Sequence, residues 1–211
     1  MRRRSRSPAA GRQKICDLRV MPLTSTLIDS RSHSMLLMRN IESKFRCSGH
    51  DGVRVRAMAG GATDQGIVDQ RDVFFRVPQG RLKLRHVNGH GQLIAYVRDN
   101  VAEARPSEYR IFTTGEPQAL EEVLGSALTL VETVQKRRHV LIHHHTRIHL
   151  DEVTHLGRFV ELETVVGEIE DEDARREHGE LVRLLELEAC ERVAMGYVDL
   201  LTRLQPPRLE D

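Results

Sequence analysis

The chain has 211 residues, a length that suits one compact domain of ordinary size with a tail. Its 32 basic and 31 acidic residues give a formal net charge of +1, so the molecule as a whole is not a polycation adapted to coat nucleic acid or an anionic membrane. Aromatic residues make up only 4% of the chain and tryptophan is absent, which disfavours the base-stacking surfaces of single-stranded nucleic-acid binders.

Apolar runs and cysteines exclude further classes. No apolar run reaches the roughly 20 residues that a helix needs to span a bilayer. The three cysteines, Cys16, Cys47 and Cys190, are scattered without CxxC spacing, so the sequence indicates neither a disulfide framework nor a zinc site. We therefore expect a cytoplasmic protein without a membrane or nucleic-acid partner.

The first 37 residues differ in composition from the rest of the chain. They include MRRRSRSPAAGR, are rich in Arg and Ser, and are expected to form a disordered basic tail. A transit peptide or an RNA-binding tail would have a similar composition. A start codon upstream of Met35 or Met38 is the preferred interpretation, because a clear pattern begins at Arg39. We expect one folded domain over residues 38–205 and a short tail over 206–211.

Hydrophobic periodicity predicts about eight strands and three or four helices. Before the last hairpin, strands are expected at Asn40–Arg46, Val68–Val77, Arg81–Arg85, Leu93–Arg98, Ser107–Phe112 and Val131–Ile142. Helices are expected at Asp51–Met58, at Glu116–Leu128, after Glu168 and at Ala189–Leu204. The order of elements predicts an α+β protein that is mainly antiparallel β.

Residues 146–165, TRIHLDEVTHLGRFVELETV, read as two strands joined by a tight turn. Because side chains alternate between faces, Asp151 shares an ionic face with Glu161 and Glu163 across the hairpin. Clustered carboxylate oxygens are typical ligands of Mg²⁺ or Mn²⁺. His149 lies on the same face, where it could orient a phosphate or a carboxylate, or serve as a hydrogen-bonded structural histidine. A half-buried strand with one solvated face gives the same alternation, so the hairpin alone leaves both interpretations open.

Charges on the predicted strands are sorted by sign. Cations occupy alternate positions at Arg81, Lys83, Arg85, Arg98, Lys136, Arg138 and Arg147, and acids occupy Glu42, Asp151, Glu161 and Glu163. Eight antiparallel strands closed into a barrel would turn these faces inward. Unpaired buried charges are costly, so such an interior needs an anion beside its cations and a metal beside its carboxylates. A polyphosphate chelated to Mg²⁺ supplies both.

Eight blocks of sequence occur in a recognisable order between about Arg39 and Leu204. They are NIESK, DQRDVFF, VPQGRLKLR, LIAYVR, RPSEY, QKRR, TRIHLDEVTHLGRFVELE and GYVDLL. In this order they resemble the CYTH superfamily, and most of all the branch named after class IV adenylyl cyclases, whose relatives include thiamine triphosphatases and inorganic triphosphatases. The resemblance implies an eight-stranded closed tunnel with three or four flanking helices. In such a tunnel basic residues bind a triphosphate and acidic residues hold one or two divalent metals.

The resemblance also assigns roles to individual residues. The opening Glu-x-Glu-x-Lys signature of the family falls on Asn40, Glu42 and Lys44, so its first glutamate is absent here. Asn40 offers a carbonyl oxygen but no charge, which weakens the case for a second metal. The expected triphosphate-binding residues are Lys44, Arg81, Lys83, Arg85, Arg98, Lys136, Arg138 and Arg147. The expected metal ligands are Glu42, Asp151, Glu161 and Glu163, and the expected catalytic residues are Lys44 and Arg138.

The function expected from this resemblance is that of an enzyme dependent on Mg²⁺ or Mn²⁺. By analogy with class IV adenylyl cyclases it would convert ATP to cyclic AMP and pyrophosphate. Two alternatives stay open, a triphosphatase acting on inorganic or organic triphosphate and a non-catalytic protein that binds a polyphosphate or a nucleotide. In each case the partner is a small-molecule triphosphate, and the protein is expected to be a monomer or a homodimer.

Overall fold

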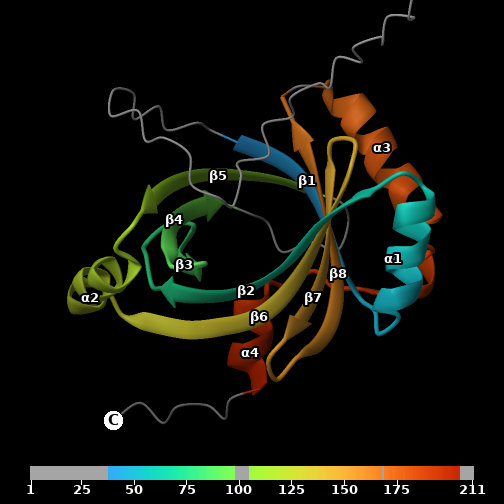
Figure 1. Cartoon of the computed structure of the whole chain (residues 1–211). Helices are drawn as coiled ribbons and strands as arrows, with labels where there is room; N and C mark the ends of the chain where they lie inside the picture. Colours follow the sequence, from blue (N-terminus) through green and yellow to red (C-terminus); the bar gives the residue numbers. More distant parts are fainter. Residues whose placement is uncertain (1–37, 98–104, 168, 205–211) are drawn as a thin grey trace, which may run out of the picture. The chain divides into compact units, whose positions relative to one another are not determined.

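The structure is a computed structural model, and it describes residues 38–97, 105–167 and 169–204 (Figure 1). The strands are β1 Met38–Arg46, β2 Thr63–Phe75, β3 Arg81–Val87, β4 His90–Val97, β5 Arg105–Thr114, β6 Leu130–His143, β7 Thr146–Val153, β8 Gly157–Val166 and β9 Glu191–Arg192. The helices are α1 His50–Ala59, α2 Pro117–Ala127, α3 Asp171–Leu184, the short 3-10 helix η1 Leu187–Ala189 and α4 Tyr197–Leu204. The predicted α+β class with antiparallel strands is confirmed, and none of the helices in these ranges is long and apolar enough to cross a membrane.

All strands belong to one sheet, in the order β5-β4-β3-β2-β6-β7-β8-β1-β9. β1 pairs with β8 along Arg39–Arg46, and its other edge pairs with β5 along Met38–Glu42. Beyond Glu42 this second edge pairs with β9 instead, at Phe45 and Arg46. The expectation of an eight-stranded closed barrel is therefore wrong. The sheet has nine strands among the described residues, and β1 and β5 join over only five residue pairs instead of forming a continuous wall.

Helices α1 and α3 lie next to each other and cover one face of β1, β6, β7 and β8 (Figure 1). Alternation along the strands places Phe45, Ile148 and Leu162 on this outer face, where they are fully buried against Val53 of α1 and Leu181 of α3. Full burial of each such side chain contributes about 1.5 to 3 kcal/mol to folding. Because these apolar side chains occupy the outer face, the charged side chains at the alternate positions must point to the opposite face of the sheet.

Helix α2 packs on the same outer side of β2 and β3, where Leu120 and Leu124 contact Val73 and Leu84. The hairpin between β3 and β4 turns at Asn88 and Gly89, with φ angles of 49° and 77°. Two successive positive φ angles are the signature of a type I′ turn, which the Asn-Gly pair favours. This turn joins the strands expected at Arg81–Arg85 and Leu93–Arg98 into an antiparallel hairpin.

The segment expected as a helix over Ala189–Leu204 is helical only in its second half. Arg192 and Glu191 pair with Phe45 and Arg46, and the Val193 amide donates a hydrogen bond of 2.9 Å to the Lys44 carbonyl. The edge of β1 that β5 leaves free offers hydrogen-bond partners to the backbone of residues 191–193. These residues are therefore extended rather than helical.

Candidate functional site

The side chains that alternate with the outer core residues point to the opposite side of the sheet, which we call the inner face. Strands that are not neighbours in the sheet converge there on helix α4. The ammonium groups of Lys44 in β1 and Lys136 in β6 lie 4.0 and 5.3 Å from the ring centroid of Tyr197. Tyr197 is itself buried, and it packs edge-on against Phe159 with ring centroids 5.1 Å apart. The inner face is therefore a partly enclosed interior with α4 over one part of it.

One end of the inner face holds a basic cluster of Lys83, Arg85 and Lys136 around the carboxylate of Asp72. Arg85 donates two hydrogen bonds to the two oxygens of Asp72, at 2.7 and 2.9 Å. The ammonium nitrogens of Lys83 and Lys136 lie 3.0 and 3.8 Å from Asp72 Oδ2. Three cations on one buried acid leave this cluster with an excess of positive charge, which favours binding of an anion.

The protonation equilibria of the basic cluster reflect burial and mutual charge. Burial alone would raise the pKa of Asp72, but Arg85, Lys83 and Lys136 hold it well below its usual value. Burial and the nearby charge of Arg138 lower the pKa of Lys136 to about 7. Lys136 is thus the cation in this cluster that can gain or lose a proton near neutral pH.

Arg138 links the basic cluster to the acidic part of the inner face. Its guanidinium donates to both oxygens of Asp151, at 2.7 and 2.6 Å, and to Glu161 at 2.7 Å. The hydroxyl of Tyr197 donates a further hydrogen bond of 2.9 Å to Asp151. Burial would raise the pKa of Asp151, but Arg138 and Lys136 lower it to about 2. Both oxygens of Asp151 are occupied, so this predicted metal ligand would have to exchange a partner to bind an ion.

The acidic part of the inner face contains Glu161, Glu163 and His149. One ligand atom from each lies within 4.8 Å of the other two. His149 is 4% exposed, and its Nδ1 atom has no hydrogen-bond partner among the described residues. Two carboxylates and a buried ring nitrogen with no partner fit a divalent cation such as Mg²⁺ or Mn²⁺. Lys44 lies 2.9 Å from Glu161 and compensates part of its charge.

The remaining predicted residues of the first strand lie beside this group. Glu42 stands opposite Glu163 in the register of β1 and β8. Asn40 is buried, and its side-chain oxygen accepts a hydrogen bond of 3.4 Å from the hydroxyl of Tyr109. Arg147 lies 3.4 Å from Glu163. Asn40, where the chain departs from the family signature, therefore lies two residues along β1 from Glu42, which stands opposite Glu163 of the acidic part.

Arg81 lies apart from the basic cluster, at the contact between β3 and helix α4. Its guanidinium is 2.9 Å from Asp199 of that helix. Arg81 thus helps to hold α4 over the inner face. Arg98, the remaining predicted cation, lies outside the described residues.

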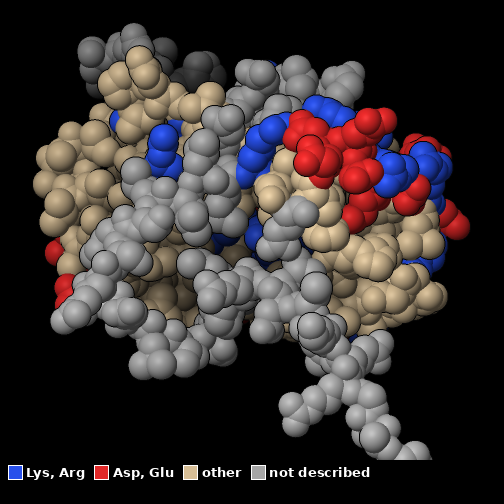
Figure 2. Space-filling model, turned by 90° about the horizontal axis from the view of Figure 1, so that it is seen from above, with Lys and Arg blue, Asp and Glu red and all other residues tan. Residues whose placement is uncertain are grey.

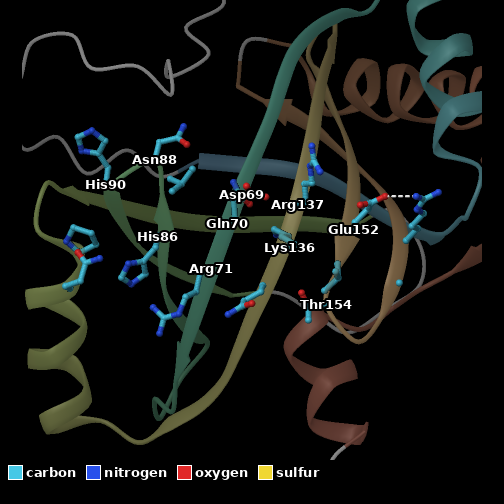
Figure 3. Close-up of a pocket in the computed structure, with 18 residues that line it drawn as sticks. Asp69, Gln70, Arg71, His86, Asn88, His90, Lys136, Arg137, Glu152 and Thr154 are labelled. Atoms are coloured by element: carbon cyan, nitrogen blue, oxygen red, sulfur yellow. Dashed lines mark ion pairs between the residues drawn. The ribbon is translucent and has the colours of Figure 1, made fainter.

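A groove of about 790 Å³ opens beside the inner face, between the β3–β4 turn and the β7–β8 turn (Figure 3). Gln70 and Lys136 belong to the inner face and also line this groove. Several other charges of the lining are paired, for example Glu152 with Arg158 at 2.7 Å (Figure 3). On the surface seen in Figure 2, the described charged residues gather toward one side and carry both signs, so they form no continuous basic patch there.

Reasoning from sequence missed three polar residues of the inner face, Asp72, Gln70 and Tyr197. Gln70 and Asp72 alternate along a strand that was predicted, so their shared face could have been identified from the pattern DQRDVFF. The Gln70 side-chain oxygen is buried and without a hydrogen-bond partner among the described residues. Nothing in the spacing of Tyr197 indicates its contact with Asp151, since the two residues lie far apart in sequence.

The comparison with family models decides which family this arrangement represents. The model of the CYTH domain matches residues 38–197, which is most of the chain. The chain belongs to the CYTH domain family. Its predicted membership is confirmed, and the CYTH match spans the strands β1 to β9 that carry the inner face. A search of curated proteins found no match.

Solved structures similar to this CYTH domain support the fold. The PH1012 protein from Pyrococcus horikoshii OT3 has 23% sequence identity and a TM-score of 0.67, and the match covers 76% of this chain and 98% of that one. A candidate adenylate cyclase from Vibrio parahaemolyticus has 18% identity and a TM-score of 0.63, with 77% and 97% covered. HpAC1 from Hippeastrum, a candidate adenylyl cyclase described as revealing a dominant triphosphatase activity, has 14% identity and a TM-score of 0.58, with 82% and 99% covered.

Proposed function

We propose that this CYTH protein is an enzyme, dependent on Mg²⁺ or Mn²⁺, that hydrolyses a triphosphate bound along the inner face. The observation that carries the proposal is the arrangement around Arg138. On one side lies the basic cluster with its excess of positive charge. On the other lies the group of two carboxylates and His149, whose Nδ1 atom has no hydrogen-bond partner among the described residues. A chain of phosphates that carries a chelated cation matches both.

The basic cluster would hold the phosphates. Lys83 and Arg85 already present their donors to the buried carboxylate of Asp72, which fixes their positions before a ligand arrives. Pre-positioned donors lose little conformational entropy when an anion replaces part of that contact. Gln70 is buried on the same strand face, and the NH2 group of its side chain would donate a hydrogen bond to one end of the anion.

Reaction chemistry would take place where the basic and acidic parts meet. Arg138 and Lys44 lie within 3 Å of Glu161 and would stabilise charge that develops on the phosphoryl oxygens. Lys136, with a pKa of about 7, would take up a proton when the triphosphate binds and would then add a positive charge at that point. Glu161, Glu163 and His149 would hold the divalent ion, which would supply Lewis-acid stabilisation and a more acidic water.

Cyclisation of ATP is a second candidate. The candidate adenylate cyclase from Vibrio parahaemolyticus has a similar fold, and HpAC1 is named a candidate adenylyl cyclase although its description gives triphosphatase activity as dominant. In that reaction a ribose hydroxyl replaces water as the nucleophile, while the same phosphate and metal contacts are used. Hydrolysis is preferred here because it requires only the charged groups already brought together, without a site for the nucleoside.

The test incubates the purified full chain with inorganic triphosphate or ATP, in the presence of Mg²⁺ or Mn²⁺. Release of orthophosphate is measured together with pyrophosphate and cyclic AMP. Glu163→Gln removes one of the proposed ligands, and Glu186→Gln is a matched control, because Glu186 is exposed and outside the strands. Orthophosphate release that depends on the metal and on Glu163 supports hydrolysis. Cyclic AMP with pyrophosphate supports the second candidate, and binding without turnover contradicts both.

A further inference from the structure

His149 occupies an unusual position for a histidine that serves only in packing. It lies on the inner face of β7, is 4% exposed, and has no hydrogen-bond partner at Nδ1 among the described residues. Leaving a buried polar atom unpaired costs roughly 1 to 3 kcal/mol, so such atoms usually have a partner that the protein chain alone does not show. The surroundings of Nδ1 indicate what that partner is.

The nearest anionic atoms are Glu163 Oε1 at 3.7 Å and Glu161 Oε2 at 3.9 Å from His149 Nδ1. Both separations are too long for a hydrogen bond, which places nitrogen and oxygen within about 3.2 Å of each other. They match two ligands of one metal ion instead. In a metal site each nitrogen or oxygen ligand lies about 2.0 to 2.2 Å from the ion. When the ligand–metal–ligand angle is a right angle, a tetrahedral angle or somewhat wider, two such ligands lie about 3 to 4 Å from each other.

A protonated His149 acting as a counter-ion for the two glutamates is the main competing explanation. The geometry disfavours it, because an imidazolium paired with these carboxylates would donate a hydrogen bond through Nδ1, and both oxygens lie beyond hydrogen-bond distance of that atom. The glutamates also have other cations. Lys44 and Arg138 contact Glu161 at 2.9 and 2.7 Å, and Arg147 lies 3.4 Å from Glu163.

We infer that His149 is a metal ligand through Nδ1, and that the site formed with Glu161 and Glu163 selects Mn²⁺ or Co²⁺ over Mg²⁺. Magnesium prefers oxygen donors and retains its waters, whereas imidazole nitrogen binds transition-metal ions more readily. The inference deepens the proposed function and rests on the same site, but it concerns the ion alone. It replaces the all-carboxylate set expected around Asp151 with a mixed set, since one ligand atom each of His149, Glu161 and Glu163 lie within 4.8 Å of one another. An ion bound there would displace contacts that Lys44 and Arg138 make with Glu161.

The first experiment uses the unmodified protein and Mn²⁺ without any phosphate compound. Pulsed electron paramagnetic resonance of a sample with one equivalent of Mn²⁺ should show coupling of the ion to a directly bound imidazole nitrogen. Calorimetry with each ion separately should give a Mn²⁺ dissociation constant at least about tenfold lower than that of Mg²⁺. Bound Mn²⁺ without nitrogen coupling would overturn the inference whatever the variants show.

The second experiment compares His149→Asn with His144→Asn. His144 is exposed in the β6–β7 turn at a φ of 48°, a conformation that asparagine tolerates, so the control removes a nearby imidazole outside the inner face. His149→Asn should lose the nitrogen coupling and reduce the preference for Mn²⁺ over Mg²⁺ about tenfold. His144→Asn should keep both. Thermal melting of each variant verifies that the fold is retained.

Whether His149→Asn weakens or strengthens metal binding distinguishes a metal ligand from a counter-ion of the glutamates. If His149 were a cation beside the glutamates, its removal would strengthen binding of both ions, because repulsion of the incoming metal would fall. Tighter binding by His149→Asn, or an unchanged preference, would contradict the inference. These readouts do not depend on turnover, so nitrogen-coupled Mn²⁺ in a protein that processes no triphosphate would leave the inference standing and refute the proposed function alone.

Discussion

Replacing Asp72 by Asn should show whether the basic cluster is a preformed anion site. Asp72 is 2% exposed and contacts three cations, Lys83, Arg85 and Lys136. Asp72→Asn keeps the shape and one acceptor oxygen but removes the only negative charge in that cluster of four described residues. The cations then repel one another in a buried setting, so the unliganded protein should be destabilised.

The size of the effect follows from the burial of the pairs. Removing one partner of a buried ion pair costs about 3 to 5 kcal/mol, and the retained amide oxygen places the expected loss near the lower end, about 3 kcal/mol. In a domain of this size each kcal/mol lowers the melting temperature by about 2 to 4 °C, so the variant should melt about 6 to 12 °C lower. Inorganic triphosphate supplies the missing negative charge and should restore most of this loss.

The assay is thermal unfolding with and without inorganic triphosphate, in the presence of a chelator so that no turnover occurs. Asp69→Asn is the matched control, because Asp69 lies on the same strand but is exposed, and it should change stability by less than about 0.5 kcal/mol. A melting temperature of Asp72→Asn within about 2 °C of the parent, or equal stabilisation of both by triphosphate, would refute the reasoning.

Three further predictions concern the metal, the first strand and a proton. Glu163→Gln should reduce metal-dependent phosphate release at least about tenfold while the melting temperature changes little, since its nearest cation is Arg147 at 3.4 Å; full activity would remove Glu163 from the metal site. Asn40→Glu adds a carboxylate beside Glu42 and should lower the metal concentration at half-maximal activity, so identical titration midpoints would show that position 40 does not reach the ion. Triphosphate binding should raise the pKa of Lys136 above about 7 and take up protons between pH 7 and 8, because an anion favours the charged amine. Calorimetry in buffers of different ionisation enthalpy measures that uptake, which Lys136→Met should abolish; no uptake by the parent would contradict the prediction.

The inner face could be predicted because alternation is a local property of the chain. The period of two assigns Lys83 and Arg85, or Glu161 and Glu163, to one side of a strand without knowledge of any other strand. The outer face follows from the same pattern, since leucine, isoleucine and phenylalanine fill the alternate positions. Strand locations and the β3–β4 hairpin were therefore predictable.

Partners across the sheet could not be predicted in this way. Arg138 and Asp151 stand opposite each other in the register of β6 and β7. As a result Arg138, a predicted phosphate-binding residue, donates hydrogen bonds to Asp151, a predicted metal ligand. Register depends on the lengths of turns and on packing of both faces, so residue types alone leave it open. The contacts of Asp72 with its three cations depend on register in the same way, because those cations come from two other strands.

The chain end was predicted least well. The pairing of β9 with β1 requires an edge that β5 leaves free after Glu42, and that edge exists only in the assembled sheet. The short strand in turn positions α4, whose Tyr197 reaches Asp151. Propensity favours a helix throughout this segment, and tertiary hydrogen bonding overrides it in the first half.

The aromatic residues of the inner face give the protein a built-in optical reporter. The chain has three tyrosines and no tryptophan. The ring centroid of Tyr96 lies 5.7 Å from the ammonium nitrogen of Lys83. The hydroxyl of Tyr109 donates a hydrogen bond to Asn40, and that of Tyr197 donates one to Asp151. The tyrosine fluorescence of the protein therefore comes from phenol rings that lie at the charged interior, with no tryptophan emission to mask it. Emission intensity and lifetime consequently record events at the site itself, and a ligand titration can be followed without attaching a dye.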